Sequence, residues 1–210
     1  MRSMIKLLAA LALLVATFSQ HTIALADDNF HSRGQSSTAF FSSTDPSGCI
    51  VTNVFVFASE EGFRSPPEPG ETASWTEFAI SQFDVCTEPL TVLLDAEGFA
   101  VLSDADFQVS RKLDFAALNT TANAFDEVSR TWFEVSIHLT WTGTGPLTHQ
   151  NNTTHFNSPD CHINAHFNNP FRDAEASGSI SDGTTNFTPE PSVEAAISSS
   201  NYGVVIVGCN

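Results

Sequence analysis

The sequence predicts an all-β fold with antiparallel strands, arranged as a β-sandwich or, alternatively, as a β-barrel. Three observations favour this class. Several segments alternate apolar and polar residues, others are rich in β-branched and aromatic residues, and 18 phenylalanines against one tyrosine supply bulky packing without polar atoms. Breaks rich in Gly, Pro and Ser separate these segments, which predicts many short strands, as in both architectures.

The clearest strand lies within residues 131–141. Its apolar side chains occupy every second position: Phe133, Val135, Ile137, Leu139 and Trp141. This period of two is that of a strand buried on one face. Residues 118–124 alternate in a similar way, and the polar residues 126–130 separate the two segments. The two strands are therefore predicted to form a hairpin.

Three other segments have the composition of strands. Residues 49–58 are apolar on both phases, which predicts a central strand covered on both faces. Residues 175–181 and 184–188 flank Asp182 and Gly183, a pair suited to a two-residue primed turn, so we expect a second hairpin there. The β-branched residues 202–209 predict a strand at the end of the chain.

Two segments are less regular. Within residues 104–119, Leu113 and Ala116 could line a helix, but Phe107 and Val109 fit a period of two, and the strand is favoured. Residues 64–70 hold three prolines and a glycine, which predict an exposed, stiff loop between strands.

The N-terminal residues have the order of a secretion signal. Arg2 and Lys6 precede an apolar run at 7–18, and the small-residue pattern Ala24-Leu25-Ala26 follows. The run is well short of the roughly 20 apolar residues that cross a bilayer. We therefore expect a cleavable signal peptide at 1–26 and a single secreted domain at 27–210, extracellular or periplasmic, with no membrane span after cleavage.

The charge balance is strongly acidic. After residue 26, six basic residues remain against 24 acidic ones, so the mature chain carries a net charge of −18 with histidine neutral. Proteins that bind nucleic acid neutralise phosphates with Lys and Arg. The sequence therefore argues against nucleic acid as a partner.

The even number of cysteines is consistent with export to a compartment where disulfides form. Cys49, Cys86, Cys161 and Cys209 form an even number, and no two have C-x-x-C spacing, which argues against a redox or zinc-ribbon motif. Three pairings are possible. We favour Cys49 with Cys86 and Cys161 with Cys209, because each bond would close one half of the chain.

Histidines cluster between residues 149 and 166. The cluster comprises His149, His155, His162 and His166. Imidazole is a common ligand of zinc and copper, so these four are the candidate metal ligands. On an extended strand His162 and His166 would share one face with Asn164 and Asn168, and this polar, solvent-facing strand surface is the favoured interpretation.

No motif identifies a catalytic residue. The chain lacks a G-x-S-x-G elbow, and pairs such as Asp104 and Asp106 are common in so acidic a sequence. The leading hypothesis is therefore a non-enzymatic secreted module without a cofactor. It would bind an unknown extracellular ligand or protein partner through loops, or serve as a structural part of the cell surface. The alternative is a metal-binding secreted protein, or a metal-dependent enzyme, that uses the four histidines with zinc or copper.

Overall fold

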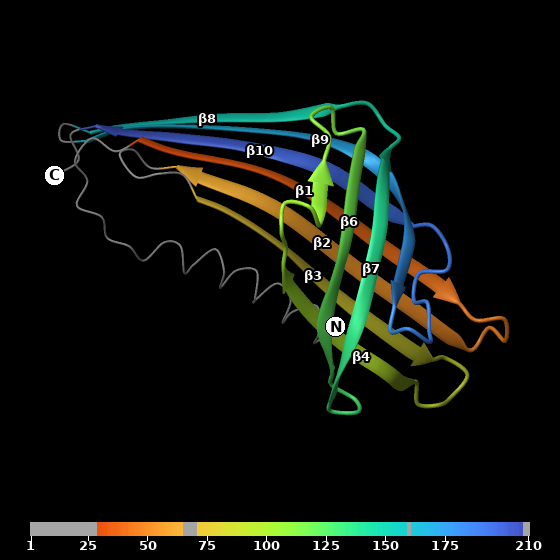
Figure 1. The fold of residues 1–210 in the computed structure, drawn as a ribbon. Coiled ribbons are helices and arrows are strands. Elements are labelled where there is room, and N and C mark those ends of the chain that lie inside the picture. The colour runs from red at the N-terminus through yellow and green to blue at the C-terminus, as the bar shows by residue number, and fades with distance from the viewer. Residues whose placement is uncertain (1–28, 65–70, 159–160, 208–210) are drawn as a thin grey trace.

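A computed structural model describes residues 29–64, 71–158 and 161–207 (Figure 1). These residues form ten β-strands: β1 (Asn29–Thr44), β2 (Ile50–Arg64), β3 (Glu71–Asp84), β4 (Thr91–Val101), β5 (Phe107–Val109), β6 (Phe115–Asp126), β7 (Thr131–Gly143), β8 (Thr148–Ser158), β9 (Cys161–Ser181) and β10 (Glu194–Val207). The expected signal peptide and most of the proline-rich loop lie outside the described residues.

All strand pairs are antiparallel and belong to one hydrogen-bonded sheet, in the order β10-β1-β2-β3-β4-β6-β7-β9-β8, with β5 paired to β6. Because β10 pairs with β9 as well as with β1, the path of strands returns to itself (Figure 1). The predicted antiparallel all-β class is confirmed. The finer choice between sandwich and barrel stays a prediction. Among the described residues, no helix has the length and apolarity to span a membrane.

The hydrophobic core occupies one end of the long strands. Residues paired directly in an antiparallel sheet point to the same face. Val56 of β2, Ile137 of β7 and Ile197 of β10 all point to the inner face and are fully buried. Trp141 is also fully buried, and its Nε1 donates a hydrogen bond of 2.8 Å to the carbonyl oxygen of Thr38.

Beyond the core, the inner face changes from apolar to polar. On β1, Phe41 and Ala39 are buried in the core, and the same face continues with Ser37, Gln35 and Arg33. On β10, Ala195 and Ile197 are followed on that face by Ser199 and Asn201. In Figure 1, β1, β2, β3, β8, β9 and β10 run together toward the left, away from β4, β6 and β7. The strands therefore extend past the core that holds them together.

The predicted hairpin at 118–141 is confirmed as β6 and β7, joined by a turn at residues 127–130. The doubly apolar segment is the central strand β2, which pairs with β1 and β3. One face is fully buried there, whereas outer residues such as Phe55 and Phe57 are only half-buried. Residues 107–109 and 115–126 are strands, as favoured over a helix.

Two expectations about strands are wrong. Residues 184–188 form no strand after the Asp182-Gly183 turn, and a single bridge joins Ser181 to Asn186. The reason is that Asp182 Oδ1 accepts hydrogen bonds from the backbone of Thr184 and Thr185, which fixes a wider turn. The strands are also long rather than short: β9 has 21 residues and β1 has 16. Their Ser-rich and Asn-rich segments pair as strand instead of forming breaks.

The disulfide between Cys49 and Cys86 is confirmed and connects the start of β2 to the segment after β3. Val85 also donates a backbone hydrogen bond of 2.8 Å to Cys49. Cys161 is disulfide-bonded, while Cys209, its predicted partner, lies outside the described residues.

Candidate functional site on the polar inner face

Strand pairing places a set of polar side chains on one continuous surface beyond the core. We call this surface the polar inner face. It comprises His31, Arg33, Gln35 and Ser37 on β1; Glu60 and Arg64 on β2; Thr72 and Ser74 on β3; His149, Asn151, Thr153, His155 and Asn157 on β8; His162, Asn164, His166, Asn168 and Arg172 on β9; and Ser199 and Asn201 on β10.

The registers arrange these residues in rows that cross the strands. One row begins with Arg33 on β1, which is opposite Asn201 on β10; Asn201 is in turn opposite Asn168 on β9. Asn168 is opposite Asn151 on β8, so four polar side chains cross four strands. These residues come from distant parts of the chain, and backbone pairing alone brings them together.

A pocket of about 370 Å³ lies on this face between β2, β1 and β10. Its lining includes the side chains of Arg33, Gln35, Glu60, Ser199 and Asn201. The lining thus offers a guanidinium, a carboxylate, two amides and a hydroxyl, which together can donate and accept hydrogen bonds.

Four buried side-chain atoms of the described residues have no hydrogen-bond partner: Ser37 Oγ, Asn164 Oδ1, Asn168 Oδ1 and Arg172 Nε. All four belong to the polar inner face. A buried polar atom left without a partner costs about 1–3 kcal/mol, so native proteins rarely keep such atoms together. Ser37 follows Gln35 on the inner side of β1, and Asn168 is opposite Asn201, so two of these residues adjoin the pocket.

The four predicted metal ligands all lie on this face, on β8 and β9. His155 is opposite Asn164 and is therefore the diagonal neighbour of both His162 and His166. His149 lies at the other end of β8, opposite Pro170. Among the described residues, the histidine nitrogens do not gather as three ligand atoms within 4.8 Å. His162 Nδ1 contacts Asn157 Oδ1 instead.

His31 is a neighbour that the sequence did not reveal. It is opposite Gly203 on β10, and Gly203 is opposite His166 on β9. A Cβ atom at Gly203 would lie 2.3 Å from His166 Cε1, so the His166 ring covers the glycine. Because Gly203 has no side chain, it leaves room between the imidazoles of His31 and His166, one on each side of β10. No local sequence signal could have paired His31 with a histidine so far along the chain.

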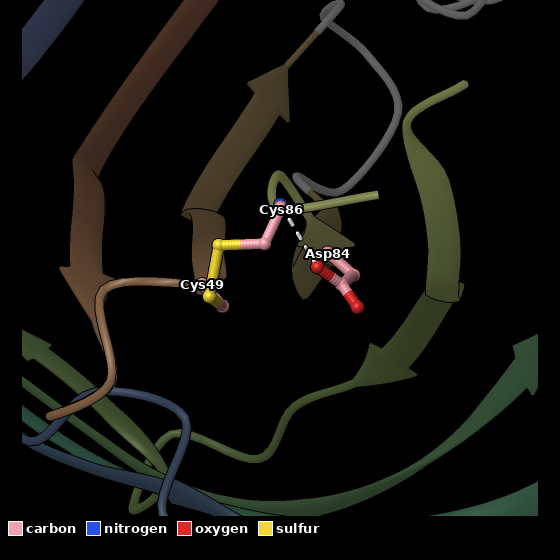
Figure 2. Close-up of side chains that lie close together, drawn as sticks. All are labelled: Cys49, Asp84 and Cys86. Atoms are coloured by element: carbon pink, nitrogen blue, oxygen red, sulfur yellow. Dashed lines mark hydrogen bonds between the residues drawn. A yellow bond between two sulfur atoms is a disulfide. The ribbon is translucent and has the colours of Figure 1, made fainter. Parts of the chain in front are cut away.

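One group of potential metal-ligand atoms does occur in the described part of the chain, at Cys49, Asp84 and Cys86 (Figure 2). Both sulfur atoms belong to the disulfide, so neither is the thiolate that binds a metal. Asp84 Oδ1 accepts a hydrogen bond of 2.9 Å from the backbone of Cys86. This group is a cross-linked turn rather than a metal centre.

A second pocket, of about 310 Å³, contains two carboxylates, Asp126 and Asp182. Burial raises the pKa of Asp126, but hydrogen bonds from Ser129, Val128 and Asp95 lower it more. Burial also raises the pKa of Asp182, and hydrogen bonds from Thr185 and Thr184 again lower it overall. Both carboxyl groups are therefore ionised at neutral pH, whereas glycoside cleavage needs one acid with a raised pKa.

No family model matches the chain, and no curated protein matches it. A crystal structure of a protein assigned as AttH, from Nitrosomonas europaea, aligns with 92% of this chain and 56% of its own, at 11% sequence identity and a TM-score of 0.30. The chain spans little more than half the length of that protein. This similarity is too low to define a fold or an activity.

The turn carboxylate Asp126 makes stability depend on pH. Because its pKa in the folded protein lies below the ordinary value of 3.8, its stabilising effect is complete above that pH and is lost as the pH falls through the folded value. We expect Asp126→Asn to lower the free energy of unfolding by about 1–3 kcal/mol at pH 7. Urea denaturation at pH 7 and pH 2.5 should show the difference shrink at acid pH; an equal difference at both values would contradict this role.

Proposed function

We propose that the protein is a secreted, non-enzymatic binding protein that holds a polar ligand on the polar inner face. The observation that carries the proposal is the group of unpartnered buried atoms on this face, of which Ser37 Oγ and Asn168 Oδ1 belong to residues that adjoin the pocket. A ligand rich in hydroxyl or acidic groups would give these atoms partners. The proposed ligand site therefore lies on the faces of paired strands, whereas the sequence favoured a site on loops.

The rigidity of the face supports a binding role. Arg33, Gln35 and Asn201 project from strands paired on both sides, so their backbone positions are set by hydrogen bonds across the sheet. A site built on strands is held more firmly than one built on loops, which lowers the entropy lost when a ligand binds. The disulfide of Cys161 on β9 agrees with the oxidising compartment that we propose.

The ionised carboxyl groups support binding over catalysis. The backbone of Ile50 donates to Asp45 and the backbone of Ser103 donates to Asp106, and these hydrogen bonds lower the pKa of each carboxyl. Asp126 and Asp182 also have lowered pKa values and hold turns. These groups are engaged in local structure and are poor proton donors at neutral pH.

The binding role can be tested with the mature protein and a panel of neutral sugars, acidic sugars and amino acids, using thermal shift to detect binding. Compounds that raise Tm of the wild type should lose this effect in Asn201→Leu, which replaces a lining amide with an apolar group of similar size. The matched control is Thr121→Leu, at an exposed position outside the polar inner face. Hits that stabilise Asn201→Leu equally, or a panel without hits, would refute the proposal.

A metal-binding role is the second candidate; the strand register supports it, but the imidazole rings would have to rotate, because the described histidine nitrogens do not gather as three ligand atoms within 4.8 Å. Diagonal neighbours on adjacent strands lie about 7–8 Å apart, within reach of long side chains. His155 therefore has both His162 and His166 within reach, and His31 approaches from across Gly203. Zinc or copper would fit such a set of imidazole ligands.

This second role predicts stoichiometric zinc or copper in protein purified without an affinity tag. His162→Ala and His166→Ala should each reduce the bound metal, measured by elemental analysis. His149→Ala is the control and should retain it, because six residues of extended strand, or about 20 Å, separate His149 from His155. Metal-free wild-type protein that takes up neither ion on dialysis would end this candidate.

A further inference from the structure

The basic residues of this acidic chain are unevenly placed. Three of the six that follow residue 26, Arg33, Arg64 and Arg172, belong to the polar inner face. Glu60 is the one carboxylate of that face. Strand alternation turns neighbouring acids such as Glu61 and Asp173 to the opposite side. The inner face is therefore positive within a strongly negative protein.

Within the described residues, these three arginines have no ion-pair partner. In the described part of the chain, the one salt bridge within 4.0 Å joins Arg130 to Glu127. The carboxylate of Asp114 lies near Arg172. The hydrogen bond from the Ser110 hydroxyl is the main cause that lowers the pKa of Asp114, and the charge of Arg172 adds a minor part. Arg33 lines the pocket with its side chain exposed, so its guanidinium fork is accessible to an acidic group.

Hydroxyl-recognising groups adjoin the positive charge. Asn201 follows Arg33 in the same row, and Asn168, whose Oδ1 is unpartnered, follows Asn201. A free inorganic anion would engage the arginine and leave the amides unused, and a neutral sugar would do the reverse. Between Ser37 and His31 the face extends about 20 Å along β1, which suits a chain of several units.

We infer that the ligand is an acidic oligosaccharide, with a carboxylate or sulfate on Arg33 and its hydroxyl groups on Asn201, Asn168 and Gln35. This inference rests on the proposed function and specifies its ligand class. Arginine binds such acidic groups through two parallel hydrogen bonds, and amide side chains both donate to and accept from hydroxyls.

The test is isothermal titration of the mature protein with three acidic probes: tetragalacturonate, an alginate tetramer and a heparin-derived tetrasaccharide. Each is compared with a neutral form, in which the carboxyl groups are methyl-esterified and, for the heparin fragment, the sulfates are also removed and the amines acetylated, and with inorganic phosphate and sulfate. At least one acidic tetramer should bind, and its neutral form should bind at least tenfold more weakly. Arg33→Gln should weaken the acidic tetramer at least tenfold, whereas the control Arg111→Gln, an exposed basic residue in a turn, should stay within twofold.

The outcomes separate the two proposals. Neutral sugars that bind as tightly as acidic ones, with loss in Asn201→Leu, would overturn the acidic ligand and leave the binding face standing. If inorganic phosphate or sulfate binds as tightly as the tetramers, the face is a simple anion site, and the inference of an oligosaccharide ligand is overturned. Failure of every acidic tetramer would overturn this inference, and if no compound needs Asn201 the proposed function fails as well.

Discussion

The register of β10 against β1 on one side and β9 on the other is the constraint on which the polar inner face depends. This single strand brings the beginning of the described chain beside its last third. It places Asn201 between Arg33 and Asn168, and Gly203 between His31 and His166. A shift of one residue would turn each of these side chains to the other face, because the side-chain period of a strand is two.

The same strands serve two purposes along their length. At one end, side chains such as Val56 and Ile197 exclude water and supply the hydrophobic stabilisation of the fold. On the N-terminal side of Ser37 the inner positions of β1 become polar, so backbone hydrogen bonds hold that part of the sheet together. A polar face that continues from a packed core keeps rigid strand positions without filling its own surface with apolar groups.

The sequence predicted the class of fold and the parts where apolar and polar residues alternate without interruption, such as β6 and β7. It could not predict the full length of β1, because its inner side changes from apolar to polar midway and the pattern loses its phase. Of β10 it predicted only the C-terminal half, because residues 198–201 are polar on both faces. Strand β8 is exposed at every residue and so has no periodicity to detect. The pocket around Arg33 and Asn201 depends on pairing between distant segments, which no local pattern encodes.

The most direct test of the account is a cross-linking measurement on β9 and β10. Directly opposite residues have Cα atoms about 4.5–5.5 Å apart, which a disulfide can span. The double variant Asn168→Cys with Asn201→Cys should form a new disulfide, detected by mass spectrometry of peptides. Asn168→Cys with Tyr202→Cys, in which the second side chain points to the other face, should not. A bond in the second pair and not in the first would show a different register and would remove the polar inner face.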